Sequence, residues 1–151
     1  MPPRMRHSRV LEGLHVVAVD DNADARTIMR EALTYDGALV TLCESADEAL
    51  FVLRYLRPQV LVADIAMPGR TGLDLIRALR VLPARDGGAV PAIAITAFGP
   101  RFPRSLAISV GFQEWLSKPV DPWELSRLVA KVAGLTGPGS RGTGSRSVDV
   151  A

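Results

Sequence analysis

Five side chains that could do chemistry together stand at or just beyond the ends of short apolar runs. They are Asp20 and Asp21 after residues 16–19, Asp64 after residues 60–63, Thr96 after residues 92–95, and Lys118 shortly after residues 112–116. Apolar runs rich in β-branched residues are typical of strands buried on both faces of a parallel sheet. Since ligands bind at the carboxyl edge of such sheets, we expect these five side chains to converge at one edge.

The three carboxylates favour a divalent cation. Without a partner they would repel one another, which raises the pKa of at least one of them. Mg²⁺ prefers oxygen ligands and takes one or two carboxylates, so Asp21 and Asp64 suit direct coordination and Asp20 suits coordination through water. No His or Cys stands near these positions, which argues against zinc.

A carboxylate beside such a cation can also act as a nucleophile and form an acyl phosphate. Phosphoryl transfer depends mainly on positioning and on neutralising the phosphoryl oxygens. The cation, the Lys118 ammonium and the Thr96 hydroxyl would each take one of these oxygens, and Ala97 would leave room for the group.

The elements that must position these residues alternate along the chain. We expect strands at 16–19, 39–43, 60–64, 92–96 and 112–116, each followed by a helix. The third helix is expected over 72–82, and the fourth is expected to be short, over 104–110, because prolines precede it. The fold class is therefore α/β: a doubly wound, five-stranded parallel sheet with five helices, in the flavodoxin-like strand order 2-1-3-4-5.

Composition indicates one domain. The 151 residues are 48% hydrophobic, and the net charge of +2 comes from arginines near the two ends. We expect a flexible lead over residues 1–13, the domain over 14–133, and a disordered Gly/Ser/Arg-rich tail over 134–151. A nucleic-acid partner is not expected, because basic residues do not cluster on a folded face. With no signal sequence, no membrane span and a lone Cys43, we expect no membrane association and a cytoplasmic location.

Read together, the motifs resemble the receiver domains of bacterial two-component response regulators. The resemblance covers roughly residues 14–133. Within the family, the chain resembles stand-alone receivers and receivers fused to hybrid kinases. The matching residues, in the family's order and spacing, are Asp20-Asp21, Asp64, Met67-Pro68-Gly69, Gly72, Thr96-Ala97 and Lys118-Pro119.

The resemblance implies a role for each of these positions. Asp64 would be the phosphoacceptor, and Mg²⁺ would be held by Asp20, Asp21, Asp64 and the Ala66 carbonyl. Thr96, Ala97 and Lys118 would bind the phosphoryl group, and Lys118-Pro119 would carry a cis peptide bond. The phosphate would come from a histidine kinase or a histidine phosphotransfer protein, and the domain would act on a downstream protein, with a weak homodimer as a further possibility. It would not be a conventional enzyme.

The resemblance also implies a switch. Phosphorylation of Asp64 would draw Thr96 inward and let Trp115 turn in, which would reshape the face formed by the fourth helix, fifth strand and fifth helix. Trp115 stands where the family usually has Tyr or Phe. Neither Ala66 nor Phe98 is a polar residue able to orient an attacking water, so slow dephosphorylation is expected.

Three other functions remain as alternatives. A pseudo-receiver would bind proteins without taking phosphate, although the Asp, Thr and Lys set disfavours it. A phosphatase of the haloacid dehalogenase type would need a second acid two residues after its nucleophile, where this chain has Ala66. A flavodoxin-like cofactor binder would need a phosphate-binding Gly, Ser or Thr loop after the first strand, where this chain has Asp20-Asp21.

Overall fold

The computed structural model describes residues 9–97 and 103–135 and contains a five-stranded parallel sheet. The strands are β1 (His15–Val19), β2 (Leu39–Cys43), β3 (Val60–Asp64), β4 (Ala92–Thr96) and β5 (Glu114–Ser117). The α-helices are α1 (Ala23–Tyr35), α2 (Ala46–Leu56), α3 (Gly72–Arg80), α4 (Arg104–Val110) and α5 (Pro122–Val132), and η2 (Ala84–Asp86) is a short 3-10 helix. The sheet order is β2-β1-β3-β4-β5, which confirms the expected fold.

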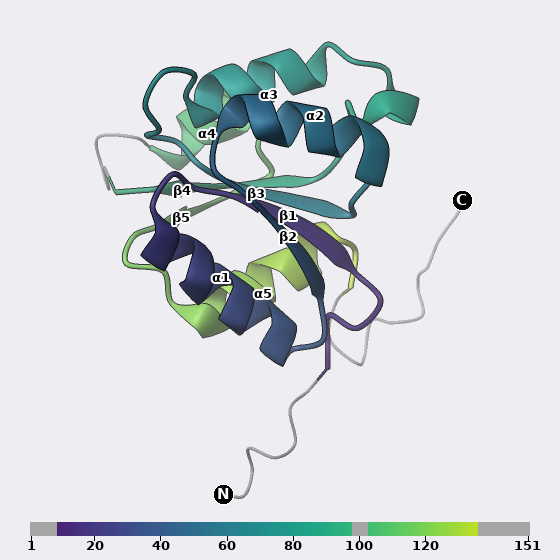
Figure 1. The fold of residues 1–151 in the computed structure, drawn as a ribbon, viewed down its shortest axis with the longest axis vertical. Helices are drawn as coiled ribbons and strands as arrows, with labels where there is room; N and C mark the ends of the chain where they lie inside the picture. The colour runs from purple at the N-terminus through teal and green to yellow at the C-terminus, as the bar shows by residue number, and fades with distance from the viewer. Residues whose placement is uncertain (1–8, 98–102, 136–151) are drawn as a thin grey trace, which may run out of the picture.

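Helices cover the sheet on both faces. Figure 1 shows α1 and α5 on one face and α2, α3 and α4 on the other. Because successive side chains of a strand point to opposite faces, each strand feeds two cores. In β1, Val17 and Val19 pack toward the α2/α3 side, whereas Val16 and Ala18 pack toward α1 and α5. All five residues of β3, the middle strand of the sheet, are buried, as are all five residues of β4.

Side-chain caps set where four of the helices begin. In each case a side-chain oxygen accepts a backbone N–H of the first turn, which satisfies a donor that has no partner within the helix. The capping residues are Asn22 for α1, Ser45 for α2, Thr71 for α3 and Asp121 for α5. The caps of α1, α3 and α5 fix the loops that follow β1, β3 and β5, where the chemical side chains lie.

Three of the expected elements have different boundaries in the structure. The first strand begins at His15 rather than at Val16, and the fifth strand ends at Ser117 rather than at Leu116. The fifth strand begins at Glu114 rather than at Phe112, because the Phe112 N–H donates to the Ala107 carbonyl and so belongs to the turn that ends α4. The third helix ends at Arg80 rather than at residue 82, since Pro83 disfavours helical backbone in the residue before it.

Leu11 is part of the folded body, although it lies in the stretch expected to be a loose lead. Its side chain is fully buried in the core beneath α1 and α5. Its backbone N–H donates to the Asp36 carbonyl at 2.9 Å. A single apolar residue among prolines and arginines gives no periodic pattern, so its burial has no signal in the sequence.

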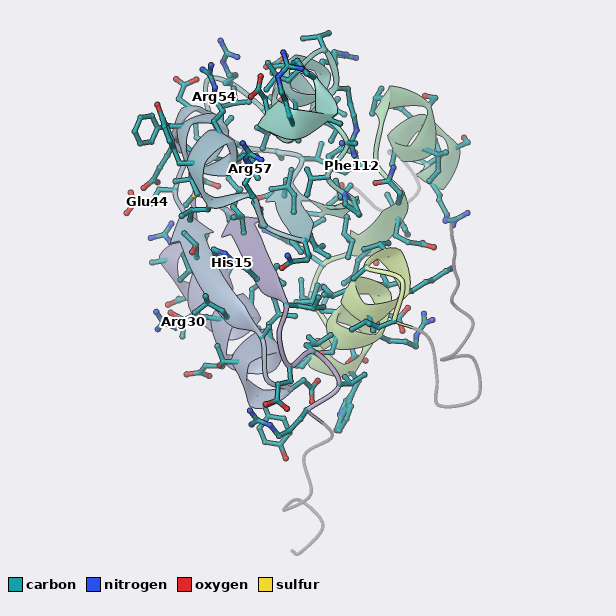
Figure 2. All side chains as sticks on the ribbon, turned by 90° about the vertical axis from the view of Figure 1, so that its right-hand side faces the viewer. His15, Arg30, Glu44, Arg54, Arg57 and Phe112 are labelled. Carbon is teal, nitrogen blue, oxygen red and sulfur yellow. The ribbon has the colours of Figure 1, made fainter. Side chains whose placement is uncertain are left out.

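Charged side chains lie on the outer surface of the fold. Figure 2 shows the exposed side chains of Arg30, Glu44 and Arg54 on the outside of the fold, whereas Phe112 lies buried within it. Within the described ranges, no helix is long and apolar enough to cross a membrane.

Candidate functional site

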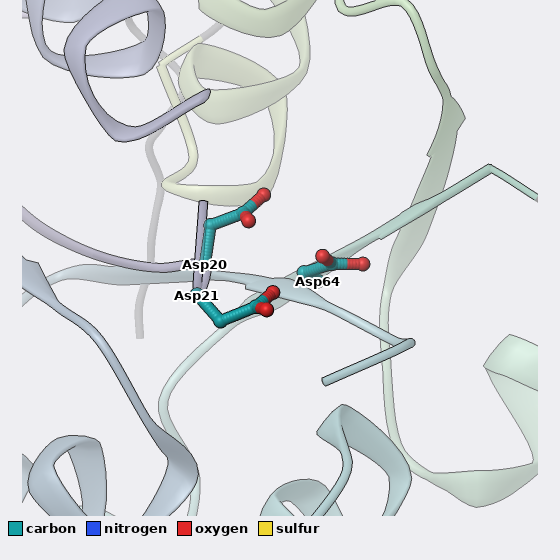
Figure 3. Close-up of side chains that lie close together, drawn as sticks. All are labelled: Asp20, Asp21 and Asp64. Carbon is teal, nitrogen blue, oxygen red and sulfur yellow. The ribbon is translucent and has the colours of Figure 1, made fainter. Parts of the chain in front are cut away.

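The sheet register brings the acidic residues together. In the pairing of β1 with β3, Val19 lies opposite Ala63, so the next residues, Asp20 and Asp64, are neighbours at the carboxyl edge. Each of Asp20, Asp21 and Asp64 offers a carboxylate oxygen, and these oxygens all lie within 4.8 Å of one another. Figure 3 shows the three side chains close together at the ends of two neighbouring strands.

Asp20 is held in place by its own turn. Its side chain is buried, and Oδ1 accepts the backbone N–H of Asn22 at 2.9 Å. The Arg26 guanidinium donates to the Asp20 carbonyl at 2.8 Å and so fixes the backbone of the acidic turn. Sequence reasoning missed Arg26, because the helical pattern assigns it to the outer face of α1 and says nothing of a contact six residues back.

Asp64 ends β3 in a buried position. Its Oδ1 accepts the Ala66 N–H at 3.0 Å, and the backbone beyond it is fixed by the Ile65 N–H, which donates to the Ile95 carbonyl. Burial, followed by the negative charge of Asp20, raises the pKa of Asp64, and the Ala66 N–H and Lys118 only partly oppose this rise. The carboxylate form of Asp64 is therefore held at an energetic cost that a nearby cation would relieve.

Lys118 spans the two buried acids. Its Nζ lies 3.2 Å from Asp64 Oδ2 and 3.1 Å from Asp20 Oδ2. Its backbone N–H donates to the Thr96 carbonyl at 2.7 Å, and the peptide bond to Pro119 is cis, the form that the resemblance implies. Burial lowers the pKa of Lys118, but hydrogen bonding and the charges of Asp20 and Asp64 outweigh this effect and raise it. Lys118 therefore stays protonated.

The other expected site residues surround this centre. Thr96 is the buried last residue of β4, and Ala97 after it is exposed. Asp21 and Ala66 are exposed at the mouth of a cavity of about 570 Å³. The cavity is lined by Asp21, Ile65, Ala66, Met67, Pro68, Thr71 and Leu73. The site thus has open access on the side where Ala66 lies.

Trp115 lies on the edge strand β5, next to β4. It pairs in register with Ala94 of β4 and packs, partly buried, against the core on the α2/α3 side. Phe98, which the expectation of slow dephosphorylation also involves, lies outside the described residues.

The donor set fits a hard divalent cation. Three carboxylates supply only oxygen ligands, which Mg²⁺ prefers. Asp20 Oδ2 is buried and, among the described residues, accepts no hydrogen bond of good geometry, although Lys118 is close enough for an ion pair. An anionic oxygen in that state has bonding capacity left for a cation.

Comparison with known proteins gives a consistent result. A family model described as the response regulator receiver domain matches residues 16–130. A 14.6 kDa protein from the sodA1 3′ region of Leptolyngbya boryana, itself uncharacterized, is 43% identical over 121 residues, which cover 80% of this chain and 91% of that protein. The response regulator MprA of Mycobacterium leprae is 31% identical over 122 residues, and the match covers 81% of this chain but only half of MprA.

Solved structures agree in fold. One similar structure is the receiver domain of the sensor histidine kinase PA1611 from Pseudomonas aeruginosa, described with a magnesium ion coordinated in the active site cleft. Its TM-score is 0.73 at 27% identity, with 81% of this chain and 98% of that chain covered. Another is the Vibrio cholerae chemotaxis protein CheY4, with a TM-score of 0.71 at 28% identity and coverage of 79% and 98%.

Proposed function

This chain belongs to the family of response regulator receiver domains, and we propose that it accepts a phosphoryl group on Asp64 in a Mg²⁺-dependent reaction. The observation that carries the proposal is the placement of Lys118 Nζ within 3.2 Å of the carboxylates of both Asp20 and Asp64. A fixed cation beside a buried carboxylate is the arrangement that positions and neutralises a transferring phosphoryl group.

The roles of the residues follow from their positions. An oxygen of Asp64 forms a bond to phosphorus while the bond from phosphorus to the donor breaks, and the bonding electrons leave with the donor. The Ala66 N–H holds Asp64 Oδ1, which leaves Oδ2 on the side of Lys118 as the attacking oxygen. Lys118 then stabilises the charge of the incoming group, and the Thr96 hydroxyl binds a further phosphoryl oxygen.

Asp20, Asp21, Asp64 and the Ala66 carbonyl would hold Mg²⁺. When bound, the ion offsets the mutual repulsion of the acids and the charge on the phosphoryl oxygens. The magnesium described in the PA1611 receiver and the acidic cluster of this chain both support this assignment.

The donor and the target are proposed from the family. A histidine kinase or a histidine phosphotransfer protein would supply the phosphoryl group, and the face made by α4, β5 and α5 would bind a downstream protein once Asp64 is modified. The chain spans about half the length of MprA but most of the Leptolyngbya boryana protein, so relatives of both sizes share this domain.

Incubation of the full chain with acetyl phosphate and Mg²⁺, followed by intact mass spectrometry, tests the proposal. We expect the mass of one phosphoryl group on the wild-type chain and none on Asp64→Ala. Asp47→Ala is the matched control, because Asp47 is an exposed acid that pairs with Arg70 and is not part of the acidic cluster. Equal incorporation in the wild type and Asp64→Ala, or none in the wild type, would refute it; the latter result would favour a protein-binding module that takes no phosphate.

A further inference from the structure

Helix α4 is the least firmly anchored α-helix of the described fold. It has seven residues, and only Ala107 among them is buried. Its N-cap is Pro103, which makes no side-chain cap hydrogen bond, whereas the other four α-helices are capped by a side chain. Leu106 and Ile108 are about 40% exposed. Little apolar burial therefore holds this helix in place, and polar ties must contribute more.

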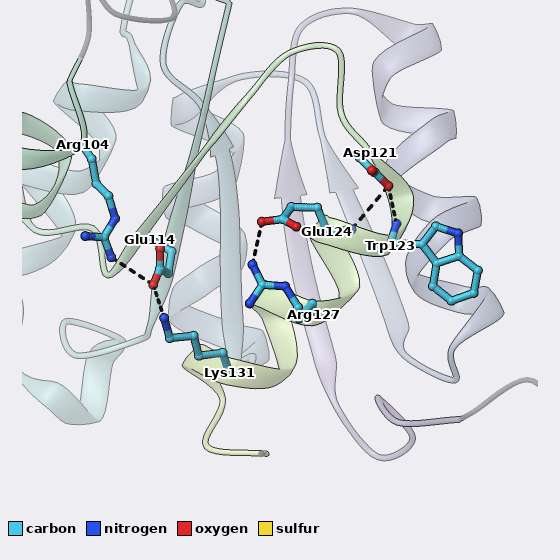
Figure 4. Close-up of polar contacts among 7 residues, drawn as sticks. All are labelled: Arg104, Glu114, Asp121, Trp123, Glu124, Arg127 and Lys131. Carbon is cyan, nitrogen blue, oxygen red and sulfur yellow. Dashed lines mark hydrogen bonds and ion pairs between the residues drawn. The ribbon is translucent and has the colours of Figure 1, made fainter. Parts of the chain in front are cut away.

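One such tie is a buried carboxylate on the edge strand β5. Glu114 is only 6% exposed, yet it carries a charge at the sheet edge. Its Oε2 accepts from Arg104 Nη2 at 3.1 Å and from Lys131 Nζ at 2.7 Å. Arg104 is the first residue of α4 and Lys131 lies in the last turn of α5, so one oxygen joins helices from the two sides of the sheet (Figure 4).

The carboxylate needs both cations. Burial raises the pKa of Glu114, but the hydrogen bonds and charges of Lys131 and Arg104 outweigh this effect and lower it. The side chains of Arg104 and Lys131 are each 57% exposed, so water can hydrate them if their contact with Glu114 is lost. The buried carboxylate would be left without a hydrogen-bonding partner. The interaction between α4, β5 and α5 therefore depends mainly on Glu114, which binds both helices to β5.

Strand β5 also connects this tie to the acidic centre. Trp115 follows Glu114 directly, Ser117 pairs in register with Thr96, and Lys118 comes next in the chain. A shift of β5 or of the start of α4 would therefore strain the Arg104 contact. We propose that Glu114 is a positioning residue that holds the first turn of α4 against β5 and α5 and so opposes the rearrangement that follows modification of Asp64. The second half of this inference rests on the proposed function; the first does not.

Hydrogen exchange on the full chain, first without any phosphoryl donor, tests the restraint. In Glu114→Gln we expect the amides of residues 106–111 to exchange about fivefold faster than in the wild type, with α1 and α5 unchanged. Arg104→Met should give the same result at α4, and it serves as the second variant if Glu114→Gln folds poorly. Glu124→Gln is the matched control, since Glu124 is an acid of α5 that forms an ion pair with Arg127 of the same helix. Unchanged exchange at α4, or faster exchange spread evenly over all helices, would overturn the proposal.

A second readout separates positioning from simple structural support. If Glu114 opposes the rearrangement, Glu114→Gln should take phosphoryl from acetyl phosphate about threefold faster than the wild type, because more molecules occupy the receptive state. A variant that only loses stability would be slower or unchanged, and that result would overturn the coupling to Asp64. If the wild type takes no phosphoryl group, the proposed function fails, and the exchange experiment still decides the restraint.

Discussion

At the scale of single residues, Asp64 combines two opposed requirements. In the proposed function it must be ionised to attack phosphorus, yet burial and the charge of Asp20 raise its pKa above the usual value of 3.8. A carboxyl whose pKa is raised on folding stabilises the fold only at low pH, and this contribution is lost as the pH rises through the folded pKa. At neutral pH the ionised Asp64 side chain therefore lowers the stability of the fold.

Asp64→Asn should consequently be more stable than the wild type at pH 7 without Mg²⁺. We expect a rise in melting temperature of about 3 °C, which corresponds to about 1 kcal/mol. The gain should shrink as the pH falls toward 3, where Asp64 is protonated in both the folded and unfolded states. Thermal unfolding followed by circular dichroism measures it, with exposed Asp47→Asn as control. A lower melting temperature for Asp64→Asn at pH 7 would contradict the sign.

Ala66 is expected to make the phosphorylated state long-lived. It is exposed beside Asp64 and offers no polar side chain to orient a water molecule. After removal of the donor, the half-life of the phosphorylated chain with Mg²⁺ should lie well beyond seconds, and Ala66→Gln should hydrolyse about tenfold faster. Ala66→Val is the control for side-chain size. Mass spectrometry over time measures the loss of the phosphoryl group. Loss by the wild type within seconds would refute this prediction.

At the scale of elements, the start of α3 supports the end of β3. A Cβ atom on Gly72 would lie 2.3 Å from the Asp64 carbonyl oxygen and 2.9 Å from Ile65 Cα, so a larger residue must push β3 and α3 apart. The sequence places Gly72 in the family motif, and the structure gives the physical reason for it.

Gly72→Ala should therefore destabilise the chain by about 2 kcal/mol and reduce phosphoryl incorporation. Gly69→Ala is a useful comparison, because its Cβ would meet open space and only its φ of +69° opposes a side chain, at a cost of about 1 kcal/mol. Urea unfolding of both variants measures the difference. A Gly72→Ala variant as stable as the wild type would contradict the packing argument.

The edge strand β5 should report on modification of Asp64 through Trp115. The other tryptophan, Trp123, is 74% exposed and would mask the signal, so the measurement belongs in a Trp123→Phe background. Acetyl phosphate and Mg²⁺ should shift the Trp115 emission, since this side chain packs partly buried beside α4 and would change its surroundings. An unchanged spectrum, with occupancy of Asp64 confirmed by mass, would count against the switch.

At the scale of the whole molecule, the features that could be predicted from the sequence are those with a local pattern along the chain. Apolar runs ending in polar residues predicted the strands of the sheet, and residues of types that commonly cap helices, such as Asn22, Ser45 and Asp121, begin three of the helices. Contacts between distant segments were not predictable in this way. The guanidinium of Arg26 on the Asp20 carbonyl and the two cations on Glu114 depend on the assembled layers, and neither has a periodic signal.

Titration calorimetry with Mg²⁺ tests the central claim most directly, because the acidic centre is proposed to need a divalent ion before Asp64 can be modified. We expect saturable binding of a single ion by the wild-type chain, and binding weaker by at least about tenfold in Asp64→Asn, with Asp47→Asn like the wild type. No saturable heat in the wild type, or equal affinity in Asp64→Asn, would contradict the account.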